Sequence, residues 1–347
     1  MAKTPAAELL IPLWQRVLQR SSIQLTDNFF ALGGCPASAD QLFAEIAEIF
    51  GRHLPSVLIY SAPTIQSLTA VLEQSNAPRV PPLLLLKAGT EQPPIFIAHG
   101  LGDTVFDLFP LAQKIDSAQP VYGMQARGID GVDEPFTSVE AMAQFHLEAI
   151  KRLQPRGPYF LIGYSLGGLV ALEIAQRLSA AGEKIALLAL VDSYPHRNQL
   201  GLIQFVRLSL RLTKRRIWSP GMTIPGGTRS EVLDPGTRNN PCANPSMSIG
   251  NVTNRMRDAA YLALKHYRPQ FYPGKIKFVR AEISTEFPHN PVKVWAHLAD
   301  QFEVETIPGD HWSMLTTQFD KLGSVLTNFL HQVSVRSGCR SFGSGSV

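Results

Sequence analysis

Residues 158–168 read Pro-Tyr-Phe-Leu-Ile-Gly-Tyr-Ser-Leu-Gly-Gly. An apolar, strand-like run enters this stretch, and a helical pattern leaves it. The small residues around Ser165 permit the tight, strained turn that lifts a serine hydroxyl above a sheet. Ser165 would then lie at a helix N-terminus, where the helix dipole favours developing negative charge. The stretch therefore predicts an α/β fold with Ser165 as a nucleophile.

A serine hydroxyl is a poor nucleophile until a base removes its proton. We expect that base to be a histidine on a loop that follows a late strand. Residues 302–309 form a strand-like pattern, and Asp310-His311-Trp312 follows it. His99 precedes the serine in the chain, while His146 and His331 fall on predicted helices. The sequence therefore predicts His311 as the base.

A third residue must orient the imidazole and stabilise its cationic form. Asp192 ends the strand that follows the serine's helix, at the carboxyl edge where sites gather in open α/β sheets. Glu282 and Glu286, after the next strand, are the rival acids. Asp310 is too close in sequence to His311 to reach round its ring. We predict Asp192 as the acid.

Strands and helices alternate from residue 94 onward, which predicts a mostly parallel sheet with helices on both faces. Residues 196–268 interrupt this rhythm with helix-like pieces around a Pro/Gly/Asn-rich middle, and we interpret them as an inserted helical lid. The expected strands are residues 95–98, 121–125, 159–163, 185–191, 276–279 and 302–307. The expected helices are residues 106–115, 139–153, 166–178 and 319–330.

The first part of the chain has a different pattern. Residues 6–75 show apolar stripes at helical spacing and predict a small all-α bundle. Residues 76–93 are rich in proline and polar residues and are interpreted as a linker with one apolar, strand-like patch. The sheet domain is expected over residues 94–332, and a Ser/Gly-rich disordered tail over residues 334–347.

Composition narrows the functional classes. Residues 197–280 hold 15 Lys/Arg and 3 Asp/Glu, a balance of +12, whereas the other residues hold 17 and 25, a balance of −8. No nucleic-acid motif accompanies the basic segment, so no nucleic-acid partner is expected. No apolar run reaches the ~18–20 residues that span a bilayer. Three widely spaced cysteines predict free thiols, no metal site and a cytoplasmic location.

Residues 94–332 resemble the α/β-hydrolase thioesterase domain that ends nonribosomal peptide and polyketide synthases. The resemblance rests on Gly-Tyr-Ser-Leu-Gly-Gly at 163–168, Leu-Val-Asp-Ser at 190–193 and Pro-Gly-Asp-His-Trp-Ser-Met-Leu at 308–315. It implies a catalytic triad of Ser165, Asp192 and His311. The oxyanion would be bound by the backbone N–H groups of Leu166 and Leu101. The family often has His-Pro in the second donor's loop, where this chain has His-Gly.

Residues 27–34, Asp-Asn-Phe-Phe-Ala-Leu-Gly-Gly, resemble the signature of peptidyl and acyl carrier domains. In that family a serine two positions after the glycines receives phosphopantetheine, but Pro36 stands there and has no hydroxyl. Ser38 is predicted on the core-facing helical stripe, and Cys35 as a packing residue rather than a thioester carrier. The resemblance therefore implies a degenerate carrier domain that binds no phosphopantetheine of its own.

The two resemblances together imply a thioesterase that uses an acyl-Ser165 intermediate. It would release an acyl, peptidyl or polyketide chain by hydrolysis, or by cyclisation if an internal nucleophile attacks. The substrate would be carried on the phosphopantetheine of a partner carrier protein or synthase module, or on coenzyme A. Two alternatives stay open: a carboxylesterase or acyltransferase on the same fold, and a non-catalytic docking scaffold.

Overall fold

The computed structural model describes residues 6–74, 80–102, 104–130, 133–196, 250–284, 288 and 290–338. The chain divides into two compact units, one with the N-terminal helices and one with the sheet. Several sequence predictions lie outside the described residues. They are the first helix-like piece of the lid (residues 200–217), most of the remaining lid, the rival acid Glu286, and Cys242 and Cys339.

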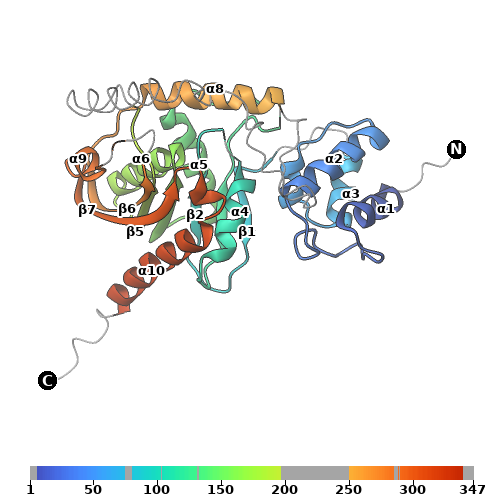
Figure 1. Ribbon diagram of the computed structural model, residues 1–347, viewed down its shortest axis with the longest axis horizontal. Coiled ribbons are helices and arrows are strands. Elements are labelled where there is room, and N and C mark those ends of the chain that lie inside the picture. Colours follow the sequence, from blue (N-terminus) through green and yellow to red (C-terminus); the bar gives the residue numbers. More distant parts are fainter. Residues whose placement is uncertain are drawn as a thin grey trace. The chain divides into compact units, whose positions relative to one another are not determined.

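The N-terminal unit is helical, as its apolar stripes predict (Figure 1). Its elements are α1 (Ala6–Leu18), α2 (Pro36–Phe50), the 3-10 helix η1 (Ser56–Tyr60) and α3 (Ile65–Glu73). Apolar side chains spaced three and four apart on these helices are fully buried, among them Leu10, Leu42 and Leu68. Trp14 anchors this core and meets the edge of Phe29 at a ring-centroid distance of 5.2 Å.

The second unit is built on a 7-stranded sheet in the order β1-β3-β2-β4-β5-β6-β7. Strand β1 pairs antiparallel with β3, and every other neighbouring pair is parallel. The strands are β1 (Leu83–Lys87), β2 (Ile95–Ala98), β3 (Val121–Met124), β4 (Tyr159–Tyr164), β5 (Ile185–Val191), β6 (Tyr272–Ile283) and β7 (Ala299–Asp310).

Helices cover the sheet in two pairs (Figure 1). The connection from β2 to β3 runs in the opposite direction to those from β3 to β4 and from β4 to β5. Right-handed crossovers therefore place the helix after β2 on one face and the next two on the other. The elements are α4 (Val105–Lys114), which packs on α10 (Phe319–Gly338), and α5 (Val139–Leu153), which packs on α6 (Leu166–Ala180). The remaining elements are α8 (Gly250–His266), α9 (Val292–Trp295) and η5 (Ser313–Leu315).

The structure differs from the sequence prediction at both ends of this unit. Strand β1 lies inside the expected linker. Its leucines alternate as in an edge strand: Leu84 and Leu86 are buried in the core, and Leu85 is exposed. The sheet unit therefore begins before residue 94. At the other end, α10 continues to Gly338, so the first residues of the expected tail are helical.

Candidate active site

Ser165 occupies the turn between the end of β4 and the start of α6. Its backbone adopts φ 53° and ψ −122°, an unfavourable conformation for a residue with a side chain. Its amide donates to the Val191 carbonyl at 2.9 Å, which ties the turn to β5. A Cβ at position 163 would collide with the Gly167 carbonyl, so only glycine fits before the turn. The sequence pattern thus forms the strained turn that it predicts.

The first turn of α6 packs directly on the end of β2. A Cβ at Gly167 would collide with the carbonyl oxygens of Ala98 and His99, so the helix approaches β2 at backbone distance. This approach brings the loop that contains Leu101 next to the turn. Leu166 is the first residue of α6, so its N–H has no partner within the helix. The two predicted oxyanion donors therefore lie on neighbouring segments.

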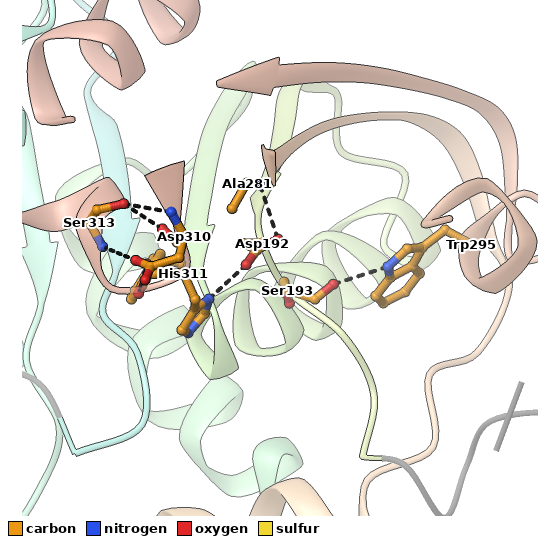
Figure 2. A network of polar contacts seen from close by, with 8 residues as sticks. Asp192, Ser193, Ala281, Trp295, Asp310, His311 and Ser313 are labelled. Atoms are coloured by element: carbon orange, nitrogen blue, oxygen red, sulfur yellow. Dashed lines mark hydrogen bonds and ion pairs between the residues drawn. The ribbon is translucent and has the colours of Figure 1, made fainter. Parts of the chain in front are cut away.

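Asp192 and His311 form a buried acid–base pair (Figure 2). Oδ2 of Asp192 lies 2.8 Å from Nδ1 of His311, and the two residues are 4% and 7% exposed. The other carboxylate oxygen, Oδ1, accepts the Ala281 amide of β6 at 3.3 Å. A carboxylate bonded to Nδ1 keeps the ring proton on that nitrogen, so Nε2 is the nitrogen that can act as a base. The pair is thus arranged to accept a proton at Nε2.

Two hydrogen bonds fix the backbone around Asp192. Asp192 has φ 44°, and its amide donates to the Val279 carbonyl of β6 at 2.7 Å. The carbonyl of the next residue, Ser193, accepts the indole N–H of Trp295 at 3.0 Å (Figure 2). Trp295 is fully buried in α9. Sequence reasoning missed this residue, because no local pattern signals a contact between residues 102 positions apart.

A compact turn holds His311 after β7 (Figure 2). The Asp310 amide donates to the Ser313 hydroxyl at 2.7 Å, and the Ser313 amide donates to Oδ1 of Asp310 at 2.9 Å. The Ser313 hydroxyl also donates to the Asp310 carbonyl at 2.9 Å. The Asp310 carboxylate therefore serves the turn rather than the imidazole, as its closeness in sequence to His311 predicts.

Tyr164 contacts His311 at two points. The two rings stack with a centroid distance of 4.8 Å and an angle of 18° between their planes. The phenol also donates to the His311 carbonyl at 2.7 Å. Among the described residues, no hydrogen bond joins the Ser165 hydroxyl to the imidazole. His311 is therefore connected to the serine's turn through Tyr164, the residue that precedes the serine.

The rival acid Glu282 does not reach this site. It is exposed near the end of β6 and has no hydrogen bond to His311, whereas Asp192 lies against the imidazole. Glu286 lies outside the described residues.

Within the described ranges, no group of three or more His, Cys, Asp and Glu side chains forms a metal site. Likewise, no helix of the described residues is long and apolar enough to cross a membrane.

A cavity of about 50 Å³ lies beside the first turn of α6. Residues from the loop after β2 and from α8 line it, so the described end of the expected lid contributes to its wall. Two of its lining residues are histidines. Burial lowers the pKa of His99, and burial lowers the pKa of His146 to about 3. Both are therefore neutral at pH 7, and the described lining is mostly apolar: Ala98, Met124, Phe136, Met142, Leu166, Val170, Met256 and Ala260.

Two sequence families match the chain. Residues 93–202 match the thioesterase domain family, and residues 8–72 match the phosphopantetheine attachment site family. The chain joins a carrier-type domain to a thioesterase domain. The thioesterase match covers Ser165 and Asp192, and the carrier match covers Pro36.

Relatives of the two domains are large synthetases. A dimodular nonribosomal peptide synthase of Bacillus subtilis is 35% identical over 195 residues, which are 56% of this chain and 8% of that protein. Malpibaldin synthetase of Mortierella alpina is 31% identical over 278 residues, 78% of this chain and 5% of that protein. Indigoidine synthase of Dickeya dadantii is 34% identical over 189 residues, which are 54% of this chain and 13% of that protein. The chain therefore spans between 5% and 13% of these relatives.

Solved structures share the fold of the thioesterase domain. A four-domain nonribosomal peptide synthetase bound to AMP and glycine superposes with a TM-score of 0.58 at 21% identity, covering 94% of this chain and 26% of that one. The type II thioesterase BorB gives a TM-score of 0.52 at 17% identity, covering 74% of this chain and 100% of that one. These likenesses support the α/β-hydrolase architecture.

Residues 27–34, which resemble the attachment signature of carrier domains, lie just before the start of α2. Pro36 is the first residue of that helix. The Ser38 hydroxyl accepts the Cys35 amide at 2.8 Å and donates to the Cys35 carbonyl at 2.9 Å, and Ser38 is 6% exposed. Cys35 is disulfide-bonded, so the expectation of free thiols is wrong for this residue. The family match shows that a phosphopantetheine attachment domain is present, in which we expect Pro36 to occupy the acceptor position.

Proposed function

We propose that the thioesterase domain releases an acyl, peptidyl or polyketide chain from a thioester through an acyl-Ser165 intermediate. The observation that carries this proposal is the buried pair of Asp192 and His311 beside the strained turn at Ser165. A buried carboxylate on Nδ1 is the arrangement that makes a histidine a general base for a neighbouring hydroxyl.

In the proposed reaction, Nε2 of His311 takes the Ser165 proton as the hydroxyl oxygen attacks the thioester carbonyl. Asp192 stabilises the imidazolium that results. The N–H groups of Leu166 and Leu101 bind the oxyanion. The thiolate then leaves and receives the proton from His311. A thiolate departs readily, because the pKa of its conjugate acid is only about 8.5.

The acyl-enzyme is resolved by a second nucleophile. Water gives a free acid, and a hydroxyl or amine within the acyl chain gives a ring. In either case His311 accepts the nucleophile's proton and returns it to the Ser165 oxygen. The acyl donor in this proposal is a partner carrier protein or synthase module, or coenzyme A, because α/β-hydrolase chemistry is here joined to a carrier-type domain.

We also propose that the carrier-type domain of this chain bears no phosphopantetheine. A phosphodiester at position 36 needs a hydroxyl, which proline lacks. Ser38 is the nearest hydroxyl along α2, and it is buried and bonded to both backbone groups of Cys35. A transferase would have to break these bonds to reach it. The domain then serves in docking or in support of the thioesterase domain.

The test uses Ser165→Ala and a fluorophosphonate. The wild-type protein is expected to hydrolyse N-acetylcysteamine thioesters and to form one covalent fluorophosphonate adduct, mapped to Ser165. Loss of the nucleophilic serine costs about 10⁶ in kcat in a characterised serine hydrolase. A Ser165→Ala protein that still turns over thioesters contradicts the mechanism. A labelled enzyme that cleaves oxyesters faster than matched thioesters supports the carboxylesterase alternative, and a wild-type protein without adduct supports the scaffold.

A further inference from the structure

Tyr164, the last residue of β4, is only 2% exposed and meets His311 through both its ring and its hydroxyl. The ring stacks on the imidazole at 4.8 Å, and the phenol donates to the His311 carbonyl at 2.7 Å. One contact controls the side chain of the base and the other controls its backbone. Together they fix the imidazole relative to β4.

The position of Tyr164 in the chain gives these contacts a function. The nucleophile follows it directly, whereas His311 lies 147 residues further along the chain. The strained φ of Ser165 sets the direction of the hydroxyl, and Tyr164 sets the position of the imidazole. Asp192 holds the same ring at Nδ1. The ring is therefore held at its edge by the residue that follows β5 and on its face by the last residue of β4.

We infer that Tyr164 is a positioning residue for the catalytic base and stabilises its protonated form during acylation; this inference rests on the proposed function. When His311 accepts the Ser165 proton, its imidazole becomes a cation against the phenol ring. The face of an aromatic ring carries negative charge density and attracts cations. The contact is then stronger in the transition state than in the ground state, which is the condition for an interaction to raise kcat.

Two substitutions separate the two contacts. Tyr164→Phe keeps the ring and removes the hydrogen bond, and Tyr164→Leu removes both. We expect kcat to fall about threefold to tenfold for Tyr164→Phe, and about a hundredfold for Tyr164→Leu. KM for a small N-acetylcysteamine thioester should stay within about twofold, because substrate binding does not use this residue. Rates are expressed per active site titrated with the fluorophosphonate, so that loss of folded protein does not count.

Tyr159→Phe is the matched control. Tyr159 lies on the same strand, is fully buried, and donates its hydroxyl to the Gln154 carbonyl at 3.0 Å. Its substitution removes a hydrogen bond to a backbone carbonyl away from His311, together with the contact of its hydroxyl with Lys151. We expect Tyr159→Phe to destabilise the domain about as much as Tyr164→Phe while keeping the wild-type kcat. Equal kcat for the two variants would overturn the inference, and this comparison decides the question even if Tyr164→Leu does not fold.

A double-mutant cycle with Asp192→Asn provides a second readout. Asp192 and Tyr164 are both inferred to act through His311, so Tyr164→Phe should slow Asp192→Asn much less than it slows the wild type. Full additivity would show that Tyr164 acts elsewhere and would overturn the inference. Turnover by Ser165→Ala would instead contradict the proposed function. The two failures are therefore distinguishable.

Discussion

Asp192 uses both carboxylate oxygens, one toward His311 at 2.8 Å and one toward the Ala281 amide at 3.3 Å. Asp192→Asn keeps the size of the side chain but presents either an amide N–H or a weaker acceptor to Nδ1. The imidazole then loses its orientation and the partner of its cationic form. We expect kcat for thioester hydrolysis to fall by about 10³–10⁴.

Glu282→Gln is the control for this substitution, since Glu282 is the exposed carboxylate of β6 near the same edge of the sheet. Burst kinetics on a chromogenic thioester compare the acylation rates of the two variants. We expect Glu282→Gln to stay within about twofold of the wild type. Equal losses in the two variants would assign the acid to another residue.

Much of the candidate site could be predicted at the level of single residues. Ser165, Asp192 and His311 each follow a strand, and strand ends at a parallel sheet's carboxyl edge converge. The residues that hold them could not be predicted. Trp295 reaches Ser193, and Tyr164 reaches His311, only through tertiary packing across more than a hundred positions of the chain. No periodicity or local motif encodes such a contact.

At the level of elements, we propose that the start of α2 prevents loading of the carrier-type domain. We expect no increase in mass when the protein is incubated with a phosphopantetheinyl transferase and coenzyme A. Pro36 lacks a hydroxyl, and Ser38 is buried and hydrogen-bonded to both backbone groups of Cys35. Intact-mass spectrometry measures this, with a functional carrier protein in the same reaction as positive control. A pantetheine adduct mapped to residues 27–50 would contradict the proposal.

Pro36→Ser is the complementary variant. It restores a hydroxyl at the first position of α2, where serine is tolerated in the helix. Paired with Cys35→Asp, it recreates the acceptor signature of the carrier family. Gain of the adduct by this double variant alone would show that residue 36 is the attachment position. An adduct on Ser38 in the wild type would show that the sequence register is different.

Elements with strong apolar patterns could be predicted from the sequence, whereas the place of β1 in the sheet could not. The five inner strands are buried on both faces, so their continuous apolar runs mark them clearly. Strand β1 is a short run of leucines in a segment rich in proline, and only its pairing with β3 makes it part of the sheet. The last turns of α10 are Ser/Gly-rich, so composition indicated a tail where the structure has helix.

At the level of the whole molecule, buried histidines make stability depend on pH. Burial lowers the pKa of His146 to about 3, whereas the same group titrates near 6.5 in the unfolded chain. Between these values the unfolded chain binds a proton that the folded domain does not. The contribution of His146 to the free energy of unfolding is therefore greatest above pH ~6.5. It decreases as the pH falls toward 3, by on the order of a few kcal/mol.

His146→Gln removes this titration. We expect hydrogen exchange of the α5 and β4 amides to show a smaller loss of stability between pH 7 and pH 5 than in the wild type. Burial also lowers the pKa of His99, so part of the pH dependence of stability should remain in this variant. The control is His266→Gln on α8, where the side chain is exposed. If His146→Gln lost as much stability between pH 7 and pH 5 as the wild type, His146 would not be the source of the pH dependence.

Charge is distributed unevenly over the whole chain, with +12 in residues 197–280 against −8 elsewhere. Its densest cluster, Lys214-Arg215-Arg216, lies outside the described residues. An acidic carrier protein or a coenzyme A thioester should be attracted to this segment, mainly through its association rate. We expect kcat/KM for these donors to fall with salt, as the screening length shrinks from about 8 Å at 0.15 M to ~3 Å at 1 M.

A neutral N-acetylcysteamine thioester is the control for the salt experiment, and its kcat/KM should change much less. Reversal of the three cluster residues to Glu should reproduce the loss at low salt. Parallel salt profiles for charged and neutral donors, together with no effect of the reversal, would show that the basic segment is only a solvated surface.

Ser165 and Asp192 share a backbone property with a broader consequence. Both have positive φ, 53° and 44°, and they follow Tyr164 and Val191, which face each other in the pairing of β4 with β5. Such conformations cost about 1–3 kcal/mol for residues other than glycine. Glycine at position 165 would relieve that cost and remove the hydroxyl that we propose as the nucleophile. Selection for thermal stability alone therefore favours replacement of Ser165. Directed evolution of a more stable variant needs a screen for turnover at every round.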